Sequence, residues 1–119
     1  MKPKRKTLRN KADRLWSEII RKRNYGQCEI PNCFRKADNP HHIIGKRNLT
    51  LRHDLRNGCL LCSHHHTLGR ESAHQDPLWF LEWLMKHRRK DYNYLMLKRA
   101  TLQTQVDYGE IIKGLERKK

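Results

Sequence analysis

The sequence predicts an α+β fold in which a short two-stranded core, built around metal ligands, lies between an N-terminal helix and several C-terminal helices. Three observations lead to this fold. Apolar residues recur at helical spacing near the start, Cys and His pairs at metal-ligand spacing occupy the middle, and helix-capping sequences occupy the end. The chain has 119 residues. Because a domain usually has about 100 to 200 residues, we expect a single domain over residues 1–119.

The chain is strongly basic, with 27 Lys and Arg against 12 Asp and Glu and a formal net charge of +15. A field of this sign attracts polyanions, so nucleic acid is the expected partner. No apolar run approaches the roughly 18 residues that a membrane-spanning helix needs, and the opening residues 1–6 lack the apolar segment of a secretory signal. We therefore expect a basic arm at residues 1–6, no membrane partner and a cytoplasmic protein.

Residues 7–25 are predicted to form the N-terminal helix. Six apolar residues recur there at three- and four-residue steps, the pattern of one buried helical face: Leu8, Ala12, Leu15, Trp16, Ile19 and Ile20. The pattern stops near Asn24 or Gly26, where we place the end of the helix. Basic residues on the opposite face either follow a nucleic-acid backbone or are simply solvated: Arg9, Lys11, Arg14, Arg21, Lys22 and Arg23.

Two pairs of ligands predict a structural zinc site. Cys28 and Cys33 flank a tight turn, and Cys62 precedes His65 by three positions. Three thiolates and one imidazole form a closed tetrahedral set for Zn²⁺. Two disulfides are the alternative for four Cys, but a reducing cytosol disfavours them. Cys59 is then a small buried core residue, or it replaces His65 as a ligand, because Cys59 and Cys62 also have ligand spacing.

Residues 28–70 contain these ligands, and we interpret the segment as strand, strand and helix. We expect a strand at 41–44, a basic loop at 45–48, a returning strand within 57–61 and a short helix within 60–69. This order around one metal is the ββα-metal arrangement. Most of the chain's eight His residues lie here, which points toward metal chemistry because neutral imidazoles are common metal ligands.

Residues 76–119 are expected to form C-terminal helices. The dipeptide Asp76-Pro77 provides an N-cap and a proline at the first helical position. Asp91 is expected to cap a second helix, and Asp107 with Glu110 resembles a capping box for a last one. We expect the apolar residues of these helices to pack against the zinc ligands; base stacking is the alternative. They are Trp79, Phe80, Trp83, Leu84, Tyr94, Leu95, Leu97, Leu102, Ile111, Ile112 and Leu115.

The order His41-His42, Asn57, Cys62-x2-His65-His66 resembles the HNH endonuclease motif, together with the zinc-knuckle pairs of many small HNH proteins. The resemblance covers residues 28–66 closely, and the run AHQDPLWFLEWL extends it more loosely to small phage and prophage HNH nucleases. It implies a ββα-metal core and a metal-dependent enzyme that hydrolyses DNA phosphodiester bonds by a one-metal mechanism. A phage-encoded enzyme of this kind would act in recombination or DNA packaging, in the cytoplasm of the host cell.

The resemblance also implies a role for each matched residue. His41 and His66 stand at metal-binding positions, so they would hold a catalytic divalent cation such as Mg²⁺, Mn²⁺ or Ni²⁺. His42 stands at the general-base position, which suits an imidazole with an ordinary pKa near 6.5. Adjacent strand residues point to opposite faces, so His41 and His42 can have different roles. Asn57 would brace the loop that carries the base or, as in some family members, join the metal shell.

Some assignments near the second His cluster stay open. We assign His65 to zinc and His66 to the catalytic cation, although either His64 or His66 could exchange roles with His65. His74 lies eight residues beyond His66. Three roles are open for His74. It could complete the metal shell or contact the phosphate, or it could be a solvated His without a role.

Lys46, Arg47 and Arg52 are the expected phosphate contacts. The expected partners are double-stranded DNA, branched DNA included, and phage packaging or recombination proteins. Two other functions remain open: a zinc-stabilised nucleic-acid-binding module without catalysis, and a nuclease selective for junctions or flaps. The sequence leaves the oligomeric state open, with a monomer among the options.

Overall fold

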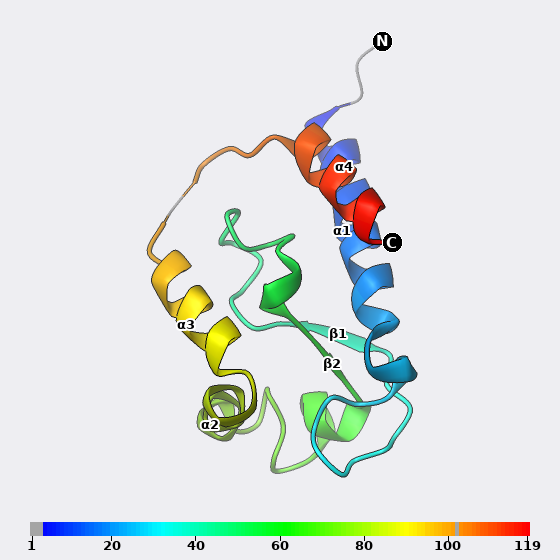
Figure 1. Cartoon of the computed structure of the whole chain (residues 1–119), viewed down its shortest axis with the longest axis vertical. Helices are drawn as coiled ribbons and strands as arrows, with labels where there is room; N and C mark the ends of the chain where they lie inside the picture. Colours follow the sequence, from blue (N-terminus) through cyan, green and yellow to red (C-terminus); the bar gives the residue numbers. More distant parts are fainter. Residues whose placement is uncertain (1–3, 102) are drawn as a thin grey trace.

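The computed structural model describes residues 4–101 and 103–119, and it has a mixed α+β fold with one small antiparallel sheet. The α+β prediction is confirmed. The elements are α1 (Arg5–Arg21), the 3-10 turn η1 (Arg23–Gly26), β1 (Asn39–His42), the 3-10 turn η2 (Leu55–Asn57), β2 (Gly58–Leu61), the π-helical turn η3 (His64–Leu68), α2 (Pro77–His87), α3 (Arg89–Lys98) and α4 (Tyr108–Lys118). In Figure 1 the sheet lies between the pair α1 and α4 and the pair α2 and α3.

Helix α1 begins at Arg5 and ends at Arg21, so it starts earlier and ends earlier than predicted. Arg5 and Lys6 belong to the helix rather than to a basic arm, and residues 1–3 lie outside the described residues. The chain turns after Arg21 because Asn24 and Tyr25 have left-handed backbone angles, with φ of 49° and 57°. The predicted apolar face is confirmed, since these residues of it are buried: Ala12, Leu15, Trp16 and Ile20.

Strands β1 and β2 pair antiparallel, with His41 opposite Cys59 and His42 opposite Gly58. The first strand begins at Asn39 and ends at His42, two residues earlier than predicted at both ends. The predicted helix from residue 60 is wrong over its first two residues, because Leu60 and Leu61 belong to β2. The backbone N–H of Glu29 donates to the Leu60 carbonyl, and the Glu29 carboxylate accepts from the Leu60 N–H. These contacts keep the chain extended, so the helix is reduced to the turn η3.

Gly58 allows α1 to lie directly on the sheet. A Cβ atom at this position would lie 2.5 Å from Ile20 Cδ1 and 2.8 Å from Trp16 Cζ2. Only a residue without a side chain fits such an approach. The contact brings Trp16 beside His42, which is paired with Gly58 on the neighbouring strand.

Two of the three predicted C-terminal caps are confirmed. The Asp76 carboxylate accepts from Trp79 N at 3.1 Å, and the Asp107 carboxylate accepts from Glu110 N at 3.1 Å. The cap at Asp91 is wrong: α3 begins at Arg89, and Asp91 lies in its first turn. Its carboxylate instead accepts from Arg88 Nε at 2.8 Å, at the junction between α2 and α3.

The packing of the C-terminal helices follows the prediction for α2 but not for α4. Phe80, Trp83 and Leu84 of α2 are buried, and Trp79 stacks on His65. Helix α4 lies along α1 (Figure 1) and buries Tyr108, Ile112 and Leu115. Leu102, expected within the second of these helices, lies outside the described residues, and α3 ends at Lys98.

Within residues 4–101 and 103–119, no helix combines the length and the apolar character needed to cross a membrane.

Candidate functional site

Four side chains that the sequence assigned to zinc come together in the structure. One ligand atom from each of Cys28, Cys33, Cys62 and His65 lies within 4.8 Å of all the others. Cys33 Sγ is 3.8 Å from Cys62 Sγ, and His65 Nδ1 is 3.6 Å from Cys28 Sγ and 3.4 Å from Cys62 Sγ. Tetrahedral Zn²⁺ ligands with S and N donors lie about 3.5 to 3.8 Å apart. The cluster therefore has the donors and the spacing of a zinc site.

Local structure explains this convergence. Asn32, at a φ of 63°, closes the turn between Cys28 and Cys33, and Cys33 N donates to Ile30 O at 3.2 Å. Cys62 directly follows β2, and η3 then returns the chain so that His65 N lies 3.5 Å from Cys62 Sγ.

The two most buried thiols of the cluster have pKa values shifted in opposite directions. Burial raises the pKa of Cys28 to about 12. Burial acts in the same direction on Cys62, but hydrogen bonds from the His65 backbone and from Cys33 outweigh it and lower its pKa. A bound metal ion holds cysteine ligands as thiolates.

Cys59 lies in the core, as predicted for a small buried residue. Its side chain is 0% exposed, and burial raises its pKa well above the ordinary value. The fourth member of the cluster is His65, so the alternative that placed Cys59 there is wrong.

A second cluster contains His41, His66 and His74, whose ligand nitrogens all lie within 4.8 Å of one another. The Nε2 atoms of His66 and His74 are 3.1 Å apart, and two imidazole nitrogens bound to one ion lie about 2.9 to 3.4 Å apart. The His41 ring centroid is 5.2 Å from each of the other two. The predicted pair is thus together, and His74 joins it as a third nitrogen donor.

Three separate segments supply this cluster. His41 comes from β1, His66 from η3 and His74 from the loop before α2. The loop is held against η3, because His74 N donates to His66 O at 3.1 Å and Ala73 N donates to His65 O at 2.8 Å. The two metal-ligand clusters therefore share η3, which carries a member of each.

The environment of the cluster favours neutral imidazoles with free lone pairs. Burial, reinforced by repulsion from His66 and His74, lowers the pKa of His41 to about 3. Burial also lowers the pKa of His66. His74 is exposed and His66 is half-buried, so one side of the cluster is open to solvent. Neutral imidazole is the form that binds metal ions.

His42 lies on the other face of β1 from His41. Its ring stacks on Trp16 with centroids 3.9 Å apart and an interplanar angle of 11°. Its Nε2 lies 2.9 Å from the carbonyl oxygen of Arg52. Because a carbonyl can only accept, Nε2 is the protonated nitrogen and Nδ1 carries the lone pair. Burial lowers the pKa of His42, so the neutral ring is available as a base at neutral pH.

Asn57 braces the loop between the strands. Its side chain is 0% exposed. Oδ1 accepts from Ile44 N at 2.7 Å, while Nδ2 donates to Ile44 O at 2.9 Å and to Leu51 O at 3.1 Å. These bonds match the first of the two roles expected for this residue. They also engage both polar atoms of the amide with the backbone.

Two of the three expected phosphate contacts are exposed and one is not. Lys46 and Arg47 are exposed in the loop after β1. The prediction for Arg52 needs correction, because its Nε and Nη2 donate to the Asp13 carboxylate at 2.9 and 2.7 Å and its side chain is only 16% exposed. Arg23, expected on the basic face of the N-terminal helix, lies beyond α1 and donates to Gly58 O at 2.8 Å.

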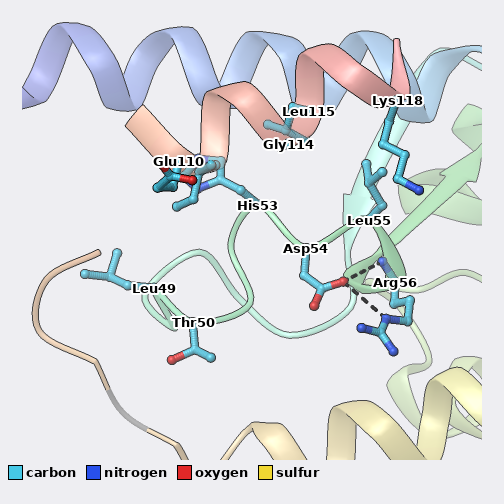
Figure 2. A pocket seen from close by; sticks show the side chains of 11 residues that line it. Leu49, Thr50, His53, Asp54, Leu55, Arg56, Glu110, Gly114, Leu115 and Lys118 are labelled. Atoms are coloured by element: carbon cyan, nitrogen blue, oxygen red, sulfur yellow. Dashed lines mark hydrogen bonds and ion pairs between the residues drawn. The ribbon is translucent and has the colours of Figure 1, made fainter. Parts of the chain in front are cut away.

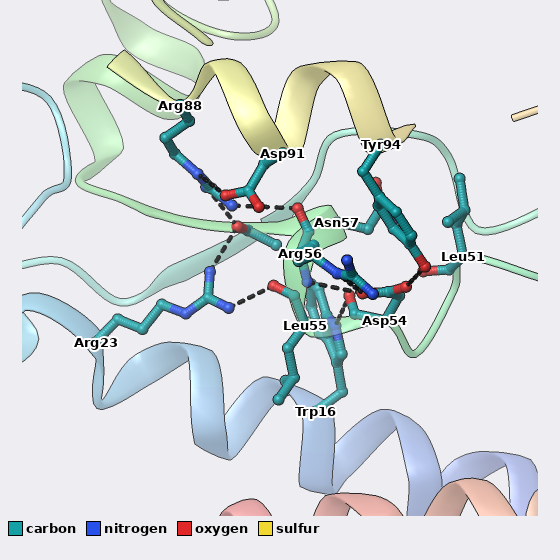
Figure 3. A network of polar contacts seen from close by, with 11 residues as sticks. Trp16, Arg23, Leu51, Asp54, Leu55, Arg56, Asn57, Arg88, Asp91 and Tyr94 are labelled. Atoms are coloured by element: carbon teal, nitrogen blue, oxygen red, sulfur yellow. Dashed lines mark hydrogen bonds and ion pairs between the residues drawn. The ribbon is translucent and has the colours of Figure 1, made fainter. Parts of the chain in front are cut away.

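Figure 3 shows how two half-buried arginines, Arg23 and Arg88, hold the segment around Asn57. Arg88 donates to the Gly58 carbonyl at 2.8 Å and to the Arg56 carbonyl at 3.1 Å, and Arg23 donates to the Leu55 carbonyl. Trp16 Nε1 donates to Asp54 O at 3.0 Å. These contacts satisfy four carbonyls around η2 and fix the position of Asn57.

Sequence reasoning missed Asp13, Trp16 and Arg88 as supporting residues. The sequence pattern could have identified Asp13, because it is an acidic residue beside the apolar face of a basic helix, between the core residues Ala12 and Leu15. Such a carboxylate needs a partner when the face packs. Nothing in the sequence distinguishes Arg88 from the other basic residues of a chain with 27 Lys and Arg.

A groove of about 600 Å³ lies apart from both clusters, between α4 and the segment that follows the basic loop (Figure 2). Leu55, Ile111 and Leu115 supply apolar lining, and Glu110 and Lys118 contribute opposite charges. It contains none of the residues predicted for the site.

Comparison of the chain with protein-family models, with curated proteins and with solved structures gives no match.

Proposed function

We propose that this protein is a metal-dependent endonuclease of the HNH type, which hydrolyses DNA phosphodiester bonds around a ββα-metal core. One observation carries the proposal. His41, His66 and His74 converge on one side of β1, while the adjacent His42 has its proton fixed on Nε2 by the Arg52 carbonyl. A nucleic-acid binder needs no such pairing of a metal-ligand cluster with an oriented base.

In this proposal His41, His66 and His74 would hold a divalent cation, Mg²⁺, Mn²⁺ or Ni²⁺. When bound, the cation would supply Lewis-acid stabilisation of charge on the phosphate and on the departing 3′ oxygen. His42 Nδ1 accepts the proton of the attacking water. Asn57 keeps the loop after β1 in place through its bonds to Ile44 and Leu51.

A structural zinc ion is the second part of the proposal. Cys28, Cys33, Cys62 and His65 would hold it as a closed set without an open position, which distinguishes a structural from a catalytic ion. Because η3 carries both His65 and His66, zinc at the first cluster would help to position the second.

DNA is the proposed substrate because of the net charge of +15. Phosphate attraction of this kind is independent of sequence. The exposed Lys46 and Arg47 follow β1 closely in the chain, so they are the proposed phosphate contacts. A phage origin and a role in recombination or packaging follow only from the family resemblance.

Cleavage of supercoiled plasmid tests the function, with Mg²⁺, Mn²⁺ and Ni²⁺ each added separately. The parent should nick or linearise the plasmid, and His42→Ala should cut about 10² to 10⁴ times more slowly, the usual contribution of a general base. His87→Ala is the matched control, because His87 is exposed beside Trp83 and belongs to neither cluster. Its rate should equal that of the parent.

Either of two results would replace the proposed function with another one. Salt-dependent DNA binding without cleavage under any of the three cations would identify a zinc-stabilised binding module. Rates on flaps or four-way junctions far above those on duplex DNA would identify a structure-selective nuclease.

A further inference from the structure

Asp13, on α1, joins two consecutive residues of the segment between the strands. Its carboxylate accepts from Arg52 Nε at 2.9 Å, from Arg52 Nη2 at 2.7 Å and from His53 Nε2 at 2.7 Å. The His53 side chain is 3% exposed and the Arg52 side chain 16% exposed. A two-pronged contact between guanidinium and carboxylate fixes orientation as well as distance.

The backbone of Arg52 has a separate task. Its carbonyl oxygen lies 2.9 Å from His42 Nε2 and so keeps the proton on that nitrogen. Arg52 therefore orients the His42 ring through its carbonyl, while Asp13 holds the side chain of Arg52.

The neighbours of Arg52 have their own anchors. Leu51 O accepts from Asn57 Nδ2 at 3.1 Å, and Asp54 O accepts from Trp16 Nε1 at 3.0 Å. Between these anchors Arg52 N donates to Asn48 O at 2.9 Å, and the side chains of Arg52 and His53 are both bound to Asp13. Loss of the Asp13 charge should thus disturb the Arg52 carbonyl more than the fold of the segment.

Helix α1 acts on His42 once directly and once through Arg52. Trp16 stacks on the ring and restricts its plane, and Asp13, three residues earlier on the same side of the helix, acts on it through Arg52.

We propose that Asp13 is a positioning residue that orients His42 as general base by clamping Arg52. The proposal rests on the proposed nuclease function and adds to it a residue outside the HNH motif. Without the clamp, the Arg52 carbonyl moves, and the His42 proton is free to occupy Nδ1, where it blocks proton abstraction from water.

Steady-state cleavage by Asp13→Asn tests this role. We expect kcat to fall about 10- to 100-fold, the usual effect of removing an outer partner of a site residue, with KM within a factor of about 3 and parental zinc content. Glu18→Gln is the matched control, because it removes one carboxylate of α1 whose partners are Arg14 and Lys119. It should leave kcat unchanged.

A double-mutant cycle distinguishes positioning from a general loss of structure. If Asp13 acts through His42, adding Asp13→Asn to His42→Ala should cause no further loss of rate. A further 10-fold loss, or a parental kcat for Asp13→Asn alone, would overturn the proposal.

Nitrogen NMR of the His42 ring gives a readout that does not depend on cleavage. The parent should have its proton on Nε2, whereas Asp13→Asn should populate the Nδ1 tautomer. If the tautomer shifts in Asp13→Asn but the parent cuts no DNA, the role of Asp13 is supported and the proposed nuclease function is wrong. An unchanged tautomer in Asp13→Asn would refute the clamp, whatever the activity.

Discussion

Asn57 illustrates how one buried amide can determine the geometry of a site. Its three hydrogen bonds hold the backbone at Ile44 and Leu51, on the two sides of the basic loop. His42 comes before this loop and Arg52 after it, so the same amide helps to keep the proposed base and the Arg52 carbonyl together. A buried polar group is costly when its partner is removed, and Ile44 presents two such groups to Asn57.

Asn57→Ala should lower the free energy of unfolding by about 2 to 4 kcal/mol, because it leaves buried backbone groups at Ile44 and Leu51 without partners. Urea unfolding of the zinc-loaded protein measures this. Asn93→Ala, at an exposed position of α3, is the control and should change stability by less than about 0.5 kcal/mol. Equal stability of the two variants would mean that the loop does not depend on the Asn57 amide.

Among the elements, the contact between α1 and β2 has a strict steric requirement. Gly58 has no room for a Cβ atom beside Ile20 and Trp16, and Trp16 in turn contacts the ring of His42. The distance between α1 and the sheet therefore determines where the proposed base lies.

Gly58→Ala should destabilise the fold by about 1 to 3 kcal/mol, because the added methyl group overpacks the contact with α1. Gly114→Ala in α4 should have the opposite sign, since nothing lies within 4 Å of a Cβ there and Ala is favoured over Gly inside a helix by about 0.8 to 1 kcal/mol. Thermal unfolding of both variants measures the two effects. A neutral Gly58→Ala would show that α1 can move away from β2 without cost.

At the scale of the whole molecule, the two clusters connect parts of the chain that are distant in sequence. Cys28 and Cys33 lie beside Cys62 and His65, so a zinc ion would link the segment after α1 to the segment after β2. A chain of 119 residues with a net charge of +15 has a modest core and strong self-repulsion. We expect such a link to contribute a large part of its stability.

Removal of zinc should therefore unfold the protein, since structural zinc contributes on the order of 10 kcal/mol in zinc-finger peptides. Circular dichroism during chelator titration, with zinc content measured in parallel, checks this. Cys62→Ser should lose the zinc, whereas Cys59→Ala should retain it because Cys59 lies in the core outside the cluster. A folded, zinc-free parent would refute the structural role.

Local patterns in the sequence determined much of this protein. The apolar stripe of α1, the caps Asp76 and Asp107, and the ligand pairs Cys28 with Cys33 and Cys62 with His65 all followed from spacing along the chain, because caps, turns and ligand pairs are made by residues a few positions apart. The structure confirms each of these local features.

Only the tertiary structure decided the rest. It chose His65 over Cys59, brought His74 to His41 and His66, turned Arg52 from an expected phosphate contact into the partner of Asp13, and packed α4 on α1. Each of these outcomes depends on the distance between residues of different elements. Spacing along the chain carries no information on such distances, because they are determined by how closely the elements can pack, as Gly58 allows between α1 and β2.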